Sequence, residues 1–295
     1  MDAQDPASRL AQVRARLDLP TVRRAAGLLD GRHRSIFTGH GQDFDDQVEY
    51  RPGDDVKDID WKSSARAGQP IIRRFVRESN LAVVLAVDTG RNMAAAAPSG
   101  ETKAEVALFV ADVVAYLARA RGDLVALVAG DAARLVQLPG RGGTAHLETL
   151  LRLVERALTR DAPPSDLGRV LDRVVALTRR SLVVVLTDAA RPEPAHEEAL
   201  RRLRTRHEVM VLAVADAPPT GAGPTADVDG VAPLPAFLRA DPGLHAEAAA
   251  AAAARAAAVR DRLRRMGVGY VTVTGTDDVV DRLAELLGRQ HRARR

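Results

Sequence analysis

The chain has 295 residues and a mass of 31.6 kDa, enough for one large α/β domain or for one domain with a small appendage. It contains no cysteine, which excludes disulfides, thiolate catalysis and cysteine-based zinc sites. The net charge is +4 and the pI about 9.9, but the positive charge is nearly all arginine scattered beside acids on predicted helices, so we expect no nucleic acid among its partners.

The N-terminal stretch lacks the apolar segment of a signal peptide, and no apolar run approaches the ~20 residues that span a bilayer. We therefore expect a cytoplasmic protein with no membrane span. The spacing of apolar residues predicts a helix over residues 8–30, broken at Pro20, and a polar loop over residues 31–47.

Residues 48–75 carry the densest run of unusual chemistry, with the only tryptophan, two of the three lysines and a cluster of acids. Turn signals occur at Pro52-Gly53 and Ala67-Gly68. We predict two short strands or a β-hairpin here, so that residues 1–80 form an N-terminal helical and β-hairpin appendage.

From residue 81 onward, apolar runs of strand length alternate with segments of helical periodicity. The predicted strands are residues 81–87, 124–129, 134–138 (an edge strand), 182–186, 209–215 and 270–273. Continuous apolar strands between amphipathic helices predict a doubly wound, mostly parallel α/β sheet of Rossmann type over residues 81–290.

Three further segments complete the prediction. Residues 216–242 are rich in proline and glycine and predict a long loop or lid, and residues 246–258 predict an alanine-rich helix. Residues 291–295 form a basic tail.

Polar residues stand where the predicted strands end. Asp88 follows the first strand, Asp188 follows the strand over residues 182–186, and Thr144 lies in a glycine-rich loop before a helix. Ligands of open parallel sheets bind at the carboxyl ends of strands, and an oxygen-only set suits Mg²⁺. The alternative is that both aspartates are strand-end residues bonded to the backbone or to Arg91.

This set resembles the metal-ion-dependent adhesion site of von Willebrand factor type A domains, whose first element is Asp-x-Ser-x-Ser. Here the stretch is Asp88-Thr89-Gly90-Arg91-Asn92, so a glycine and an amide replace both serines. The resemblance implies a degenerate site of Asp88, Asn92, Thr144 and Asp188. We expect no cofactor, or Mg²⁺ held weakly.

Four motifs before residue 81 narrow the resemblance. They are HRS over residues 33–35, GHGQDF over 39–44, EYRPGDDV over 49–56 and IDWKSSAR over 59–66. With Lys103, Gly122-Asp123 and the last helix, they make the chain similar to the domain of unknown function 58 family. The resemblance implies a von Willebrand A-like fold and a MoxR-type AAA+ ATPase as partner, together with an unknown client protein. It implies a non-enzymatic adaptor, with chaperone-like maturation of other proteins as a candidate role.

The segment over residues 48–75 has two interpretations. In the first, Trp61 pins a hairpin against the main sheet, and arginines pair with nearby acids. In the second, the segment and the strand-end Arg91 bind the partner. The residues concerned are Arg51, Asp54, Asp55, Asp60, Trp61, Lys62, Arg66 and Arg91.

An enzymatic alternative uses the same segment. Asp54 or Asp55, followed by Asp60-Trp61-Lys62, has the outline of a magnesium-dependent nuclease or hydrolase site, with two carboxylates for the metal and a lysine for the developing charge. The chain has no Gly-x-x-x-x-Gly-Lys-Ser/Thr loop, so we do not expect it to be a P-loop ATPase itself.

Overall fold

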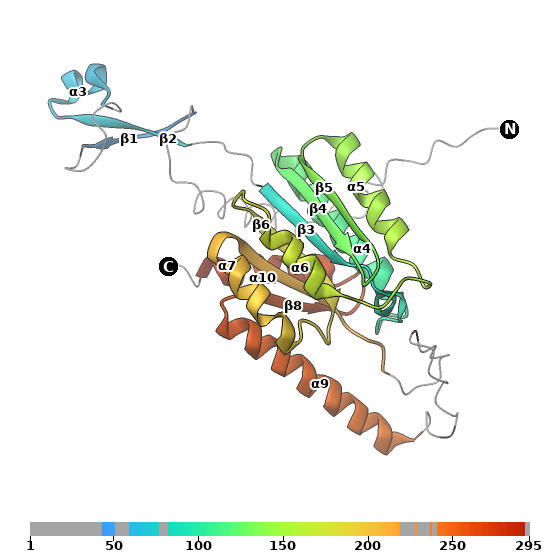
Figure 1. Cartoon of the computed structure of the whole chain (residues 1–295). Coiled ribbons are helices and arrows are strands. Elements are labelled where there is room, and N and C mark those ends of the chain that lie inside the picture. Colours follow the sequence, from blue (N-terminus) through green and yellow to red (C-terminus); the bar gives the residue numbers. More distant parts are fainter. Residues whose placement is uncertain are drawn as a thin grey trace. The chain divides into compact units, whose positions relative to one another are not determined.

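The computed structural model describes residues 43–50, 59–76, 82–218, 228, 237 and 241–292 (Figure 1). The chain divides into two compact units, one formed by Gly27–Asn80 and the other by Met1–Ala26 together with Leu81–Arg295. The predicted helix over residues 8–30 and most of the predicted loop over residues 216–242 lie outside the described residues.

The smaller unit contains a two-stranded antiparallel sheet. β1 (Asp43–Glu49) pairs with β2 (Ile71–Val76), and the helix α3 (Trp61–Ala67) lies between them in the chain. One of the two strands predicted within residues 48–75 corresponds to β2. The prediction of a loop over residues 31–47 is wrong at its end, because residues 43–47 belong to β1.

The helix α3 lies where the sequence analysis predicts part of a β-hairpin and a turn at Ala67-Gly68. Its first turn is closed by the Asp60 carboxylate, which accepts hydrogen bonds from the backbone N–H groups of Lys62 (3.1 Å) and Ser63 (3.2 Å). Its end is closed by Gly68, whose φ of 72° lies in the left-handed region. Two good caps stabilise a helix of only seven residues.

The larger unit is a six-stranded sheet with the order β5-β4-β3-β6-β7-β8. The strands are β3 (Ala82–Asp88), β4 (Leu124–Gly130), β5 (Leu135–Arg141), β6 (Leu182–Asp188), β7 (Glu208–Val214) and β8 (Gly269–Val273). All are parallel except β5, which runs antiparallel to β4 at one edge. The predicted doubly wound, mostly parallel sheet is confirmed.

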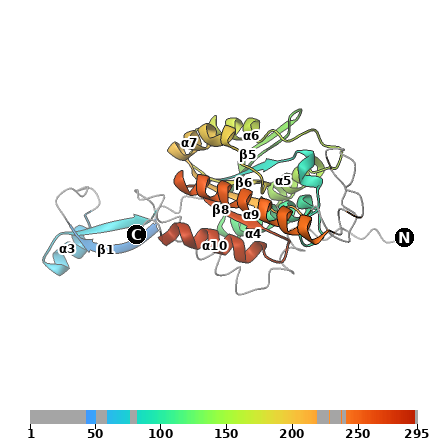
Figure 2. The same ribbon diagram turned by 90° about the horizontal axis from the view of Figure 1, so that it is seen from below.

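Helices cover both faces of this sheet (Figures 1 and 2). One face carries α6 (Leu167–Val175), α7 (Glu197–Arg206) and the C-terminal part of α9 (Pro242–Arg265), whose apolar side chains join one core with the strands. The other face carries α4 (Lys103–Arg121), α5 (Thr144–Ala157) and α10 (Val279–Arg292). Two 3-10 turns, η2 (Arg91–Ala94) and η3 (Pro194–His196), follow β3 and β6.

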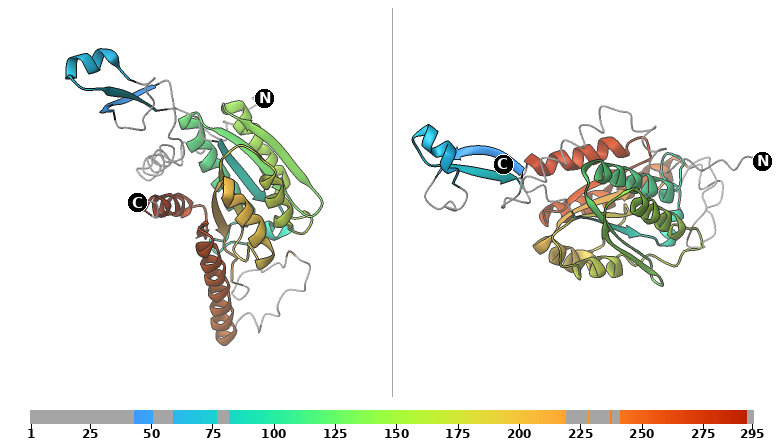
Figure 3. Two further views of the ribbon diagram at one scale, coloured as in Figure 1. Left: turned by 60° about the vertical axis from the view of Figure 1, so that its left-hand side comes forward. Right: turned by 90° about the horizontal axis from the view of Figure 1, so that it is seen from above.

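The alanine-rich helix predicted over residues 246–258 is the middle of α9. Figure 3 shows α9 as a long helix at the β8 edge of the sheet. Its buried residues, Val259 and Leu263, are near its end, while most of the preceding turns are exposed.

The strand order defines a switch point in the sheet. Numbered along the chain, the six strands follow the order 3-2-1-4-5-6, in which the direction of winding reverses between the first and fourth strands. Those strands are β3 and β6, which are paired through Val87 and Leu186. Their carboxyl ends therefore form the switch point at which this class of sheet binds ligands.

Candidate functional site at the strand ends

Asp88 is the buried centre of the switch point. Its Oδ1 atom accepts a hydrogen bond from the backbone N–H of Gly90 (3.0 Å). Its Oδ2 atom accepts bonds from the hydroxyls of Ser165 (2.7 Å) and Thr187 (2.9 Å). The side chain is fully buried, and these three neutral donors satisfy both of its carboxylate oxygens.

Asp188, at the end of β6, has a positively charged partner. The ammonium group of Lys103 contacts both the Asp188 and the Asp216 carboxylates. Lys103 is only 1% exposed, whereas the side chain of Asp216, which follows β7, is 52% exposed. Asp188 Oδ1 also accepts from the backbone N–H of Ala190 (2.7 Å). One lysine thus connects α4 to the ends of β6 and β7.

The pKa values follow from this arrangement. Burial alone would lower the pKa of Lys103, but the charges and hydrogen bonds of Asp188 and Asp216 outweigh it and raise that pKa above 10.5. Burial and the charge of Asp188 raise the pKa of Asp216, against the opposing effect of Lys103. Lys103 is therefore a permanent cation at physiological pH.

The start of α4 is fixed independently of this pairing. Thr102 and Glu105 form a capping box, in which each side chain bonds the backbone N–H of the other. The Lys103 backbone N–H donates to the Ala95 carbonyl (2.8 Å), and Glu101 accepts from both the backbone and hydroxyl of Thr276 (2.9 and 2.7 Å). These bonds hold the lysine stem at its position.

Lys103 is the first residue of its helix, where the helix dipole disfavours a cation. Helix preferences therefore do not explain a lysine at this position. The two carboxylates that its ammonium group contacts, those of Asp188 and Asp216, do explain it.

The loop after β3 carries Gly90, Arg91 and Asn92. A Cβ atom at Gly90 would lie 2.3 Å from the Ser165 Cα atom, so no side chain fits there. The Arg91 backbone N–H donates to the Pro163 carbonyl (2.9 Å), and its side chain is half-buried. The side-chain amide of Asn92 is buried with neither polar atom hydrogen-bonded within the part of the chain that the structure describes.

The structure does not bring Thr144 to this edge. Thr144 begins α5 after β5, and because β5 is antiparallel its last residue, Arg141, pairs with Val125 at the start of β4. Thr144 therefore lies at the opposite end of the sheet, where its hydroxyl accepts from Arg119 Nε (3.0 Å). The hydroxyl that does reach Asp88 belongs to Ser165, in the loop before α6.

His196 is the last residue of η3, the turn that follows β6. Its Nδ1 atom accepts a hydrogen bond from the backbone N–H of Glu193 (2.9 Å). Burial, followed by the charge of Arg191, lowers its pKa below 6.5. The ring is therefore neutral at physiological pH and adds no charge to the strand ends.

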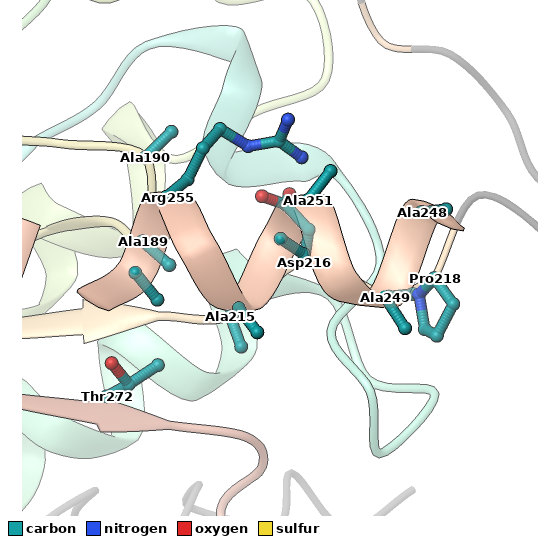
Figure 4. A pocket seen from close by; sticks show the side chains of 14 residues that line it. Ala189, Ala190, Ala215, Asp216, Pro218, Ala248, Ala249, Ala251, Arg255 and Thr272 are labelled. Carbon is teal, nitrogen blue, oxygen red and sulfur yellow. The ribbon is translucent and has the colours of Figure 1, made fainter. Parts of the chain in front are cut away.

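A cavity of about 500 Å³ adjoins Asp216 (Figure 4). It is lined by the residues after β6 and β7 and by one side of α9, mostly alanines, with Asp216 and Arg255 as its charged residues. The strand ends thus combine a buried ionic cluster with an adjoining apolar hollow.

The sequence model of the family described as "Protein of unknown function DUF58" matches residues 46–220, more than half of the chain. The chain belongs to the DUF58 family. The predicted family membership is confirmed.

Relatives of this DUF58 chain include uncharacterized proteins of Mycobacterium tuberculosis (Rv1480) and Mycobacterium bovis (Mb1516). Each is 28% identical over 219 residues, which is 73% of this chain and 67% of the relative. Similar solved structures include BatB from Bacteroides thetaiotaomicron (17% identity, TM-score 0.46, 72% of this chain and 100% of that one). Another is a von Willebrand factor type A protein from Catenulispora acidiphila, with 12% identity and a TM-score of 0.39. That match covers 75% of this chain and 44% of the Catenulispora chain.

The described residues of this DUF58 chain fit a divalent cation poorly. Asp88 is saturated by neutral donors, Asp188 is paired with Lys103, Gly90 admits no hydroxyl and Thr144 is at the other end of the sheet. Only the unpartnered Asn92 amide favours an added ligand. Among the described residues, no three His, Cys, Asp or Glu side chains are grouped as metal ligands.

Of the family motifs in the smaller unit, the one over residues 59–66 is fully described, and it includes most of α3. Asp60 is 94% buried and caps the helix, and its Oδ2 atom also accepts from the Ser63 hydroxyl (2.8 Å). Trp61 is 69% exposed, and Lys62 and Arg66 are exposed as well.

Trp61 is exposed within the smaller unit, and the interpretation that it pins a hairpin against the main sheet stays a prediction. Arg51, Asp54 and Asp55 lie outside the described residues. No helix in the described ranges combines the length and apolar character that crossing a membrane requires.

Proposed function

We propose that this DUF58 chain is a non-enzymatic interaction module, an adaptor between a MoxR-type AAA+ ATPase and a client protein, in the chaperone-like maturation of that client. The observation that carries the proposal is the internal pairing at the switch point. Asp88 is held by three neutral donors and Asp188 by Lys103. Both carboxylates are engaged by partners within the chain, which supports binding rather than catalysis at this edge.

The shape of the edge supports binding. Loops at the carboxyl ends of strands carry the functional residues of such sheets, and here they are placed by rigid strands and capped helices. The apolar cavity beside Asp216 offers a place for an apolar partner side chain. The half-buried Arg91, next to Asp88, offers a positive charge to an acidic partner residue.

The partner class follows from family resemblance and from the sequence. The chain contains no P-loop, so an energy-dependent role requires a partner that hydrolyses nucleotide. The nuclease alternative gains no support, because Asp60 caps α3 with both carboxylate oxygens engaged.

The test is binding of the ATPase by the wild-type chain, by Arg91→Glu and by Arg202→Glu, a matched reversal on the exposed surface of α7. We expect Arg91→Glu to lose about 2–5 kcal/mol of binding free energy if its charge pair is buried, and Arg202→Glu to bind like the wild type. Circular dichroism confirms that each variant is folded. Equal recovery of the ATPase by all three would remove this edge from the interface and point to the surface of α3 with Trp61 and Arg66.

A further inference from the structure

The cluster of Lys103, Asp188 and Asp216 has the charge arrangement of a cation site. Two carboxylates from the ends of neighbouring strands, β6 and β7, converge on one positive group. A divalent ion held by one or two carboxylates and several waters would use the same two groups. In this chain the positive group is an amine supplied by the protein itself.

We infer that Lys103 is the built-in cation of this site: its ammonium group occupies the position between Asp188 and Asp216 that a divalent ion would otherwise take. The site formed by Lys103, Asp188 and Asp216 is therefore independent of divalent cations, whether or not the proposed ATPase binds to the chain. The inference rests on the burial of the lysine, on its two carboxylate partners and on its fixed stem.

A permanent ammonium group competes directly with a metal ion. Lys103 is almost fully buried, and its helix start is fixed by a capping box and by the bond to Ala95, so the amine cannot leave without disturbing α4. A metal ion would have to displace this charge or lie beside it, and both are electrostatically unfavourable.

Removal of the amine should reveal the site. In Lys103→Met the stem keeps a similar length, but Asp188 and Asp216 lose their cation and leave two negative charges together. The variant should therefore be destabilised, and divalent cations should restore much of the loss because they bind the folded state only. A dissociation constant of about 1 mM is expected for so few protein ligands.

The matched control is Arg121→Met. Arg121 and Asp123 form another mostly buried ion pair, with 2.9 Å between Arg121 Nε and Asp123 Oδ2. This variant also loses a buried cation, but at the end of α4 rather than beside the two carboxylates that follow β6 and β7. It should be destabilised without becoming responsive to Mg²⁺.

The experiment compares melting temperatures of the full-length wild type, Lys103→Met and Arg121→Met in 10 mM MgCl₂ and in NaCl of equal ionic strength. Lys103→Met should melt about 3–6 °C higher in Mg²⁺, while the other two should show no difference between the salts. Mn²⁺ titration followed by electron paramagnetic resonance gives the direct readout. Binding should appear in Lys103→Met and disappear in Lys103→Met/Asp188→Asn.

Two results would overturn the inference. One is saturable, micromolar Mn²⁺ binding by the wild type; the other is a folded Lys103→Met that responds to Mg²⁺ no more than Arg121→Met does. If Lys103→Met folds only when Mg²⁺ is present during refolding, the inference is supported. If it folds under neither condition, the wild-type Mn²⁺ titration decides, with absence of binding as the supporting outcome.

Discussion

Gly90 sets the spacing of the loops around Asp88. Any Cβ atom there would meet the backbone of Ser165, the residue whose hydroxyl bonds Asp88. We expect Gly90→Ala to lower the free energy of unfolding by about 1–3 kcal/mol, because the loop before α6 must move away. Denaturant unfolding measures this loss, with Gly140→Ala as the control, since its nearest neighbour is Ala126 Cβ at 3.8 Å.

Equal stability of Gly90→Ala and the wild type would contradict this prediction. It would show that the loops carrying Gly90 and Ser165 move apart at no cost in free energy. The same contact explains why a serine at this position cannot restore a hydroxyl ligand. The departure from Asp-x-Ser-x-Ser at Gly90 is thus built into the packing of the site.

Individual residues of the site differ in how far sequence predicts them. Asp88 and Asp188 end predicted strands, and the sheet rule places them correctly at one edge. Lys103 pairs with residues 85 and 113 positions away, and Ser165 lies 77 positions from Asp88, so no local pattern joins them. Two signals point to Lys103: it belongs to the residues that carry the family resemblance, and it is a lysine at the first position of a capped helix, where the dipole disfavours it.

Among the elements, α3 has the least support from packing. It buries none of its residues, and the Asp60 cap and the Gly68 end hold it in place. Its exposed Trp61 is therefore expected to contribute little to stability, and we predict that Trp61→Ala changes the free energy of unfolding by less than about 0.5 kcal/mol. Calorimetry measures this change, and binding of the proposed ATPase should fall in the same variant if Trp61 is an anchor.

Asp60→Ala is the matched control on the same helix, because loss of a helix cap costs about 0.5–2 kcal/mol. The tryptophan emission of the wild type should be that of a solvent-exposed indole. A large loss of stability in Trp61→Ala, or a shielded emission spectrum, would contradict the exposed position and favour a structural role.

The direction of β5 explains why the site predicted from the sequence wrongly included Thr144. This strand runs antiparallel to β4. Only four residues separate the predicted strands over residues 124–129 and 134–138. A parallel connection needs a dozen or more residues, so this spacing requires a hairpin. The strand that follows β4 therefore returns to the other end of the sheet, and the loop after it cannot reach Asp88. Connection length, rather than strand count, decides which loops meet.

At the scale of the whole molecule, the apolar runs predict the large sheet well because its strands β3, β6 and β7 are buried on both faces. The smaller unit is predicted less well. Its helix depends on caps rather than on a periodic apolar pattern, so periodicity does not distinguish that helix from a strand.

The position of the core predicts how the chain can be divided. Among the residues whose burial is described, every buried hydrophobic side chain lies between Ala82 and Leu287, and the six strands and their covering helices lie between Ala82 and Arg292. We therefore expect a fragment of residues 81–295 to fold on its own, with a single cooperative transition within about 4 °C of that of the full chain, or about 1 kcal/mol. Circular dichroism and limited proteolysis measure this.

A fragment of residues 90–295, which lacks the central strand β3, should remain unfolded, because β4 and β6 both lose the strand they pair with. If the fragment from residue 81 aggregates or melts without cooperativity, residues before it complete the larger unit.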